Sequence, residues 1–314
     1  MLNKSTCIKN NYNPIIPDSL LKFIEDNKDN SESLKEWYSK HKNKICLIWP
    51  EIKTIPINIE NKINKNGYVV IDDLGLKNCK KETRELALFV FLSSLGNLTS
   101  HSINDYFWDI KHRNDIIKSN STFSERYGEC PLHSDSAFSA FSAFSAFSAF
   151  SAFSAFSAFS EFPEKYLTMY VIKPASDGGD SIFISVKNLI TQMMKVSYGP
   201  KCLSILSNEI FPFETPHSFN KSSPVFCGSI LERSNKIRFR YDCIIKGFEK
   251  KAVMKTSEKL WAVNFFNDFI QNTAERKIFP NYSDQLIIID NHYGLHARTD
   301  FQDKTRHLLR ARIS

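Results

Sequence analysis

A short histidine–aspartate motif is the first group of residues whose types and spacing suit chemistry. His133 and Asp135 stand two positions apart in the sequence PLHSD. If the motif lies on a β-strand, the two side chains share a face, and their donor atoms can reach one ion. An imidazole and a carboxylate suit Fe(II), and two histidines with one carboxylate leave coordination positions open. The motif alone is short enough to occur by chance on a protein surface.

A third metal ligand has to come from elsewhere among the eight histidines of the chain. His292 and His296 follow the apolar run Leu286–Ile289, which we expect to be a strand buried on both faces. The end of such a strand can aim a side chain into the mouth of a barrel. The spacing does not distinguish His292 from His296.

Arginines alternate along the last apolar segment of the chain. Arg306, Arg310 and Arg312 would share one face of a strand over Arg306–Ile313. Three guanidinium groups are costly to bury unless anions accompany them. If the face is internal, it forms an anion site, and arginine matches the carboxylates of a dicarboxylate cosubstrate. If the face is solvated, the pattern has no functional meaning.

Short strands with turn residues between them dominate the region that must position these groups. We expect an architecture that is mostly β with added helices, a sandwich or jelly roll. The expected strands are Tyr68–Ile71, Tyr166–Ile172, Ser181–Ser185, Ile237–Tyr241, Leu286–Ile289 and Arg306–Ile313. The expected helices begin at Asp18 or Ser19, run around Ser31–His41, and cover Lys81–Leu95 and Ser257–Thr273.

The chain divides into a helical and looped lead-in at residues 1–62 and a β domain at residues 63–314. A low-complexity repeat of nine Ser-x-Phe triplets interrupts the β domain at residues 136–162. A period of three fits neither a strand nor a helix, so no single face can collect the phenylalanines. We interpret the repeat as an expanded loop without a selected role, and an aromatic surface or lid is the alternative.

Composition narrows the class of protein. The net charge of +7 is spread over scattered lysines and forms no basic stripe, which argues against nucleic-acid binding. Seven cysteines without a CxxC pair argue against a zinc site or a disulfide framework. The chain has no apolar run of membrane-spanning length, and because its first residues include no apolar core we expect no secretory signal. We therefore expect a cytoplasmic protein with a small-molecule substrate; the sequence sets no oligomeric state.

Three ordered segments resemble the taurine dioxygenase (TauD/TfdA-like) superfamily of Fe(II)- and 2-oxoglutarate-dependent oxygenases, and in particular its clavaminate-synthase-like branch. They are LHSDSAF at 132–138, YLTMYVIKPASDGGDSIFIS at 166–185, and DNHYGLHARTDF with RHLLRARI over 290–313. The resemblance covers residues 85–314 apart from the repeat. It implies a double-stranded β-helix, which is a form of jelly roll, after an N-terminal helical region.

The resemblance also assigns the metal ligands. His133 and Asp135 match the HxD/E ligands of the family. His296, in the DNxxxLH context, matches the distal histidine, which selects it over His292. Arg306 matches the arginine that holds the distal carboxylate of 2-oxoglutarate, and Ser181 matches a serine or threonine that helps to bind the same cosubstrate.

Other positions concern the substrate. Arg310 matches a position used for the cosubstrate or for an anionic group of the substrate. Glu125 and Asp242 are candidates for receiving a cationic substrate group, with a surface or structural charge as the alternative reading. His307 would face away from Arg306 and is expected to be structural.

The activity that the resemblance implies uses Fe(II), 2-oxoglutarate and O₂ to hydroxylate an amino acid or a small natural-product intermediate, with succinate and CO₂ released. Asp135 disfavours halogenation, because related halogenases lack this carboxylate. Two alternatives are a jelly-roll protein that binds metal without turnover and an inactive paralogue whose site the repeat blocks. Arg306 and Arg310 favour the enzyme, because a bare metal site needs no clamp for a dicarboxylate.

Overall fold

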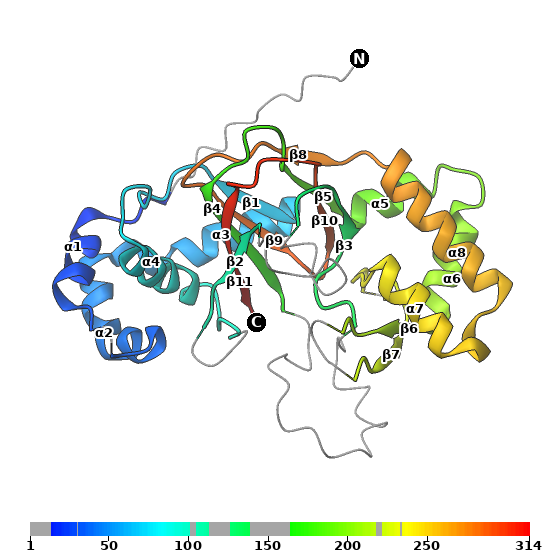
Figure 1. Ribbon diagram of the computed structural model, residues 1–314, viewed down its shortest axis with the longest axis horizontal. Coiled ribbons are helices and arrows are strands. Elements are labelled where there is room, and N and C mark those ends of the chain that lie inside the picture. The colour runs from blue at the N-terminus through cyan, green and yellow to red at the C-terminus, as the bar shows by residue number, and fades with distance from the viewer. Residues whose placement is uncertain are drawn as a thin grey trace.

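Two antiparallel sheets form the centre of the molecule (Figure 1). The computed structural model describes residues 14–29, 31–100, 105–112, 126–138, 164–217, 222–232 and 234–314. The larger sheet has the order β1 (Tyr68–Ile71), β9 (Leu286–Asp290), β4 (Tyr166–Lys173), β11 (His307–Ile313) and β2 (Trp108–Lys111). The smaller sheet has the order β3 (Cys130–His133), β10 (Gly294–Arg298), β5 (Ser181–Ser185) and β8 (Lys277–Phe279).

Strand β9 shows why the larger sheet lies at the centre, since all five of its residues are buried. Leu286 and Ile288 pack into a core shared with the N-terminal helices, whereas Ile287 and Ile289 belong to a cluster that includes Phe183 of the smaller sheet. Alternate side chains of a strand point to opposite faces, so a strand covered on both faces is apolar throughout. The expectation for this segment is confirmed, and the arrangement of the sheets is a β-sandwich with added helices.

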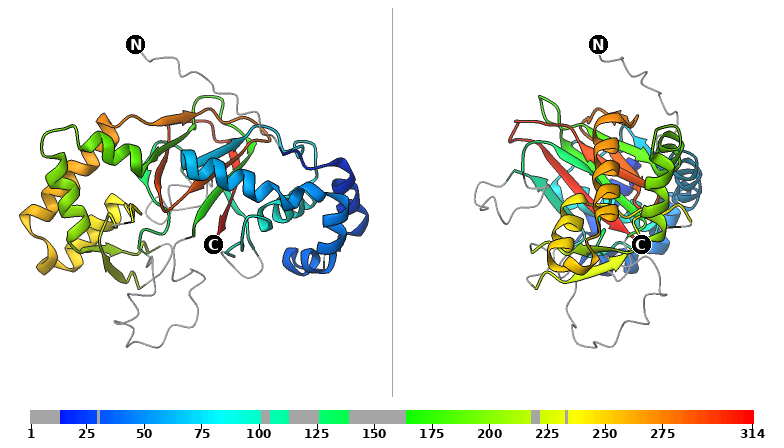
Figure 2. Two further views of the ribbon diagram at one scale, coloured as in Figure 1. Left: turned by 180° about the vertical axis from the view of Figure 1, so that it is seen from behind. Right: turned by 90° about the vertical axis from the view of Figure 1, so that its right-hand side faces the viewer.

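Helices from the N-terminal part of the chain cover the outer face of the larger sheet (Figures 1 and 2). They are α1 (Asp18–Asn27), α2 (Leu34–Ile48), α3 (Ile55–Asn66) and α4 (Lys81–Ser93), with a 3₁₀ turn η1 (Pro50–Lys53). Ser33 and Glu36 form a capping box at the start of α2, which satisfies backbone donors that the helix leaves free. These helices share one continuous apolar core with the sheet.

A second helical group lies at the opposite end of the molecule (Figure 1). It comprises α5 (Val186–Met193), α6 (Gly199–Asn208), α7 (Tyr241–Lys250) and α8 (Ser257–Asp268), with η4 (Ala252–Met254), a π-helical turn η5 (Phe269–Thr273), and the hairpin β6 (Phe211–Glu214) and β7 (Val225–Gly228). Its core includes Ile182, Ile184 and Leu295 of the smaller sheet. The smaller sheet is therefore packed between this helical group and the larger sheet.

One expected strand differs from the structure. The expected strand Ile237–Tyr241 is wrong: α7 begins at Tyr241, and the preceding residues form no strand. Their backbone amides bond to three different partners, His292, Ile230 and the Ser134 hydroxyl, rather than to one neighbouring strand. Ile237, Arg238 and Phe239 are all buried, and Ile237 forms an isolated antiparallel bridge with Leu231, so the alternation in the sequence does not correspond to a strand. Residues 139–163, which hold most of the Ser-x-Phe repeat, lie outside the described residues.

In the described part of the chain, no helix combines the length and the apolar character that crossing a membrane requires.

Candidate metal centre

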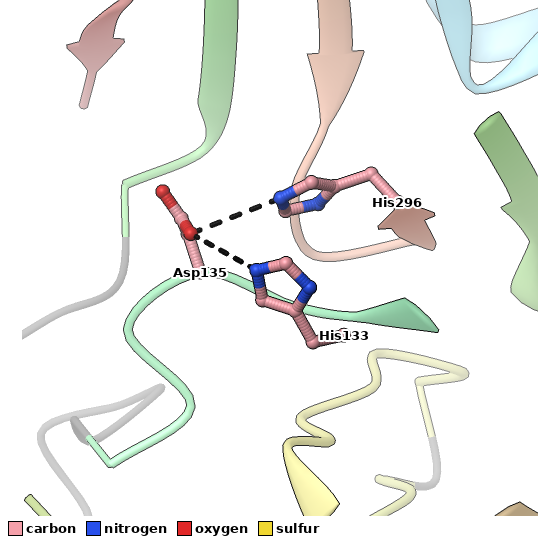
Figure 3. Close-up of side chains that lie close together, drawn as sticks. All are labelled: His133, Asp135 and His296. Atoms are coloured by element: carbon pink, nitrogen blue, oxygen red, sulfur yellow. Dashed lines mark ion pairs between the residues drawn. The ribbon is translucent and has the colours of Figure 1, made fainter. Parts of the chain in front are cut away.

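His133, Asp135 and His296 come together on the inner side of the smaller sheet (Figure 3). One possible ligand atom from each residue lies within 4.8 Å of the others, and all three residues are buried. Asp135 Oδ1 is 3.7 Å from His133 Nε2 and 3.8 Å from His296 Nε2. These separations exceed hydrogen-bond length and suit three ligands that surround one ion.

Strand pairing brings the two histidines together. His133 ends β3 and is the direct antiparallel partner of His296 in β10, so both rings project from the same face of the sheet. Their ring centroids are 4.4 Å apart. Asp135 lies in the turn after β3, not on the strand itself. The turn, rather than strand alternation, therefore brings the carboxylate to the histidines.

The carboxylate of Asp135 has two distinct sides. Oδ2 accepts a hydrogen bond from Arg310 Nη1 at 3.3 Å and lies 3.7 Å from Arg312 Nε, whereas Oδ1 faces the two imidazoles. Burial opposes ionisation, but Arg310, the contact with His133 and Arg312 hold the pKa of Asp135 well below its usual range. Asp135 is thus an ionised carboxylate that offers one oxygen to a cation.

The two histidines differ in their electrostatic surroundings. Burial, together with the positive charge of His133, lowers the pKa of His296 to about 3. Burial opposes the charged form of His133 as well, but Cys130 and Asp135 raise its pKa to about 10. Without a metal ion, His133 therefore carries the additional proton of an imidazolium, and His296 is a neutral imidazole. A metal ion that bound here would replace that proton as the cation.

The ring of His133 has a fixed orientation. Its Nδ1 lies 2.8 Å from the carbonyl oxygen of Pro131, and because a carbonyl can only accept, Nδ1 carries the hydrogen. Nε2 is therefore the nitrogen that faces Asp135 and any bound ion. A hydrogen bond of this kind fixes the tautomer of a metal-binding histidine. Two imidazole nitrogens and one carboxylate oxygen fit a mononuclear non-haem iron.

Arg306 forms a buried cationic site beside the metal centre. Only 4% of its surface is exposed, its Nη2 donates to the carbonyl oxygen of Gly179 at 3.3 Å, and its guanidinium lies over the ring of Phe301. Burial lowers its pKa to about 9, with a smaller contribution from Arg298. Within the described residues, Arg306 has no carboxylate at ion-pair distance, and its Nε has no hydrogen-bond partner. A buried guanidinium in this state calls for an anion.

Ser181 belongs to the same neighbourhood. Its hydroxyl donates to Asn281 Oδ1 at 3.1 Å, and Asn281 Nδ2 donates to the Gly179 carbonyl that also receives Arg306. Gly179 has a φ of +71°, and a Cβ there would lie 2.9 Å from Arg306 Nε. Glycine at this position therefore permits both the left-handed turn and the close approach of the arginine.

All three arginines expected on one face of the last strand are buried. Arg310 and Arg312 lie on β11 and reach the Asp135 carboxylate, and Arg306 immediately precedes the strand. The guanidinium of Arg310 also lies over the ring of Trp108. The structure thus selects the internal face over the solvated one.

The candidate substrate residues have separate surroundings. Asp242 forms a bidentate ion pair with Arg240, with separations of 3.0 and 3.2 Å. A cationic substrate group would have to compete with Arg240 for this carboxylate. Both residues, with His133, line a cavity of about 370 Å³. Arg310 contacts Asp135, and Glu125 lies outside the described residues.

Two further histidines considered from the sequence have structural contacts. The backbone amide of His292 bonds to Asp290 in the turn between β9 and β10. His307 Nε2 is 2.5 Å from Asp109 of the neighbouring strand β2.

Sequence reasoning missed three residues of this site. Asn291 bonds to the backbone of Asp135, Glu164 pairs with Arg312, and Arg312 itself approaches Asp135. Arg312 was visible as part of the alternating arginine row and Asn291 as part of the DNxxxLH segment. Nothing in the local sequence distinguished Glu164 from a surface charge.

No protein-family model matches the sequence, and no curated protein matches it at a significant level. Solved structures do match. An asparagine oxygenase in complex with Fe(II), 3-hydroxyasparagine and succinate has a TM-score of 0.66 and 15% identity, with 96% of this chain and 93% of that chain covered. The non-haem iron oxygenase OrfP in complex with Fe and α-ketoglutaric acid has a TM-score of 0.64 and 14% identity, with the same coverage.

PvcB from Pseudomonas aeruginosa has a TM-score of 0.53 and 14% identity, with 82% of this chain and 78% of that chain covered. The chain therefore shares its fold with non-haem iron oxygenases, and the resemblance stated from the sequence is confirmed at the level of the fold.

Proposed function

We propose that this chain is an Fe(II)- and 2-oxoglutarate-dependent oxygenase that hydroxylates an amino acid or a small natural-product intermediate. The observation that carries the proposal is the combination of a buried His133–Asp135–His296 triad with a buried Arg306 for which the described residues supply no carboxylate partner. The first group suits the iron, and the second suits the distal carboxylate of 2-oxoglutarate. A protein that only stored a metal ion would need the first group alone.

In this proposal, His133 Nε2, Asp135 Oδ1 and His296 hold Fe(II). The iron, with 2-oxoglutarate and O₂, supplies the oxidising chemistry that releases succinate and CO₂. The protein positions the iron and the groups that bind to it. Arg310 and Arg312 occupy Asp135 Oδ2, so the carboxylate supplies a single oxygen and the remaining coordination positions stay open for exogenous ligands.

Arg306 and Ser181 would hold the far end of the cosubstrate. Arg306 offers a buried guanidinium whose Nε meets no partner among the described residues, and the Ser181 hydroxyl lies in the same hydrogen-bonded group. A bidentate arginine–carboxylate contact fixes orientation as well as adding affinity. The proposed architecture is a double-stranded β-helix, as one domain over residues 63–314 with the lead-in packed against it. The two histidine ligands lie on the smaller sheet, and Arg310 and Arg312 lie on the larger one.

The proposed substrate is an amino acid or a close derivative. The neighbouring structures contain 3-hydroxyasparagine and hydroxy-L-arginine, so this fold accommodates amino-acid substrates. Arg310 would receive an anionic group of the substrate, and the cavity beside His133, with Asp242 and Arg240, would take its side chain. Glu125 stays a candidate from the sequence alone. A small-molecule partner, no nucleic acid and a cytoplasmic location also remain predictions of the sequence.

Anaerobic loading with Fe(II) and 2-oxoglutarate, followed by O₂ and a panel of amino acids, tests the proposal by the amount of succinate formed. We expect succinate in equal amounts with a hydroxylated amino acid, and its loss in the His296→Ala protein. The matched control is His292→Ala, since His292 lies in a turn near the site and would keep activity. Tight Fe(II) binding without succinate would instead indicate a metal-binding protein, and a chain that binds neither iron nor 2-oxoglutarate would be an inactive paralogue.

A further inference from the structure

Two residues that flank the repeat-bearing segment meet at its base. The Ser136 hydroxyl donates to Glu164 Oε2 at 3.1 Å, and Arg312 Nη1 donates to Glu164 Oε1 at 3.2 Å. Glu164 is only 2% exposed, and both of its oxygens are used. A buried carboxylate with such partners is a fixed point of the structure, because leaving it unpaired would be costly.

The carboxamide of Asn291 joins the same two ends of the chain. Its Oδ1 accepts a hydrogen bond from the Asp135 amide at 2.9 Å. Its Nδ2 donates to the carbonyl oxygens of Asp135 at 3.2 Å and of Glu164 at 3.1 Å. Asn291 is 1% exposed and follows β9, where its own amide donates to the Lys165 carbonyl at 2.9 Å. One side chain therefore binds the backbone both before and after the segment.

Arg312 connects this group to the proposed metal ligand. While Nη1 pairs with Glu164, Nε lies 3.7 Å from Asp135 Oδ2. The side-chain position of Asp135 is thus tied to Glu164 through Arg312, and its backbone is tied to Glu164 through Asn291.

We propose that Asn291, Glu164 and Arg312 form a clasp that positions Asp135 for metal binding whatever the length of the chain between Ser136 and Glu164. The inference deepens the proposed function and rests on it, because it takes Asp135 as a ligand of the iron. All three members of the clasp are positioning residues. Arg312 approaches the carboxylate at Oδ2, whereas the two histidines face Oδ1.

The physical reason for a clasp is the entropy of the connecting chain. The segment between Ser136 and Glu164 has 27 residues, and removal of seven triplets would leave six. The entropic cost of closing a connection between two fixed points grows with its length, in the ideal limit by about threefold in probability for each doubling and by about tenfold between these two lengths. Asp135 directly precedes Ser136, so without the clasp this cost would act on the position of the ligand.

Four proteins test the clasp: the full chain and a chain lacking seven triplets (residues 139–159), each with Asn291 or with Asn291→Ala. The measurements are the anaerobic Kd for Fe(II), alone and with 2-oxoglutarate, and the charge-transfer absorption of the Fe(II)–2-oxoglutarate complex. With Asn291 present, we expect the two lengths to agree within twofold. With Asn291→Ala, we expect the full-length chain to bind Fe(II) about tenfold more weakly than the shortened one. An effect of length that is the same with Asn291 and with Asn291→Ala would overturn the proposal.

Two controls separate positioning from general damage. Asn264→Ala removes an exposed asparagine of α8 and should leave both lengths unchanged. Glu164→Gln keeps an oxygen acceptor for Arg312 or Ser136 while it removes the charge, so its effect should be smaller than that of Asn291→Ala. Should Asn291→Ala fail to fold, Glu164→Ala at the two lengths provides the same comparison.

A measurement without metal distinguishes failure of the clasp from failure of the proposed function. The Asp135 amide donates to Asn291 Oδ1, so its hydrogen-exchange protection reports the clasp directly. Glu164→Ala keeps this acceptor, so the four proteins for this measurement carry Glu164 or Glu164→Ala at the two lengths. Protection that is independent of length with Glu164, and dependent on length with Glu164→Ala, would support the clasp even if the protein formed no succinate. Equal protection in all four of these proteins would refute it even if the enzyme were active.

Discussion

Two buried aspartates show the difference between a carboxylate that completes the fold and one that is left open to a ligand. Asp284 accepts hydrogen bonds from the backbone amides of Gly75 and Leu76 and, at 2.7 Å, from the Tyr170 hydroxyl. These donors tie the segment before α4 to the larger sheet. Burial raises the pKa of Asp284, and neutral donors satisfy both of its oxygens.

Asp135 is also buried, but its two oxygens have different neighbours. Arg310 and Arg312 occupy Oδ2, whereas Oδ1 faces two imidazole nitrogens at 3.7 and 3.8 Å. The protein therefore stabilises the charge of Asp135 without saturating the oxygen that faces the histidines. Burial alone does not mark a functional carboxylate; the distribution of its partners does.

Removal of the Asp135 carboxylate should give the largest change in Fe(II) binding. We expect Asp135→Ala to weaken Fe(II) binding by at least about 100-fold, because changes even to residues that only support metal ligands cost 10–100-fold. Succinate formation should fall to background. The measurement is an anaerobic Fe(II) titration together with circular dichroism to establish folding. Fe(II) affinity within a few-fold of the wild type would remove Asp135 from the metal site.

Removal of the Asp284 carboxylate should lower the stability of the fold and leave Fe(II) binding almost unchanged. Asp284→Ala leaves the Leu76 amide and the Tyr170 hydroxyl buried without their acceptor, and we expect the free energy of unfolding to fall by about 2–4 kcal/mol. The Kd for Fe(II) of the folded protein should stay within about twofold. Chemical denaturation measures the first and titration the second; a large change in Fe(II) affinity without a loss of stability would reverse the roles of the two aspartates.

Replacement of Arg306 tests the proposed binding of the cosubstrate 2-oxoglutarate. Arg306→Leu removes a buried guanidinium that pairs with no carboxylate in the described part of the chain. We therefore expect the KM for 2-oxoglutarate to rise by about 10–100-fold, as for loss of a charge-assisted hydrogen bond. Ser181→Ala should raise it by only about two- to tenfold. Steady-state kinetics at saturating Fe(II) gives both values. An unchanged KM in Arg306→Leu would make this arginine a purely structural cation.

The carboxylate of Asp109 should make the smallest contribution, a pH-dependent one to the free energy of unfolding. The hydrogen bond from His307 lowers the pKa of Asp109 to about 2. A carboxyl group whose pKa is lower in the folded protein adds stability above its unfolded value near 4 and loses this contribution as the pH falls through the folded value. Because the pair is partly exposed, we expect at most about 1 kcal/mol.

Urea denaturation of wild type and Asp109→Asn at pH 6 and pH 2.5 measures this contribution. The stability difference between the two proteins should be present at pH 6 and smaller at pH 2.5. A difference that grew on acidification would contradict the sign.

Local patterns in the sequence predicted much of the sandwich and two of the three residues that the structure groups at the candidate metal centre, His133 and Asp135. The apolar run at β9 and the arginine alternation at β11 are both consequences of strands with two buried faces, which leave a direct signal in the sequence. His296 could not be separated from His292 by spacing and was selected by resemblance, because the choice depends on the pairing of β10 with β3.

The rest depended on contacts between residues that lie far apart in the chain. Asp135 reaches the histidines through a turn that Asn291 holds from 156 positions away. Glu164 is buried only because Arg312 and Ser136 bind it. The segment before α7 alternated like a strand but bonds to three separate partners. No window of sequence contains such information.

Anomalous diffraction from crystals grown anaerobically with Fe(II) would show directly whether His133, Asp135 and His296 bind iron. We predict one iron peak within coordination distance of His133 Nε2, Asp135 Oδ1 and His296, with Arg310 and Arg312 still beside Asp135 Oδ2. An iron peak away from these three atoms, or none at full Fe(II) loading, would contradict it.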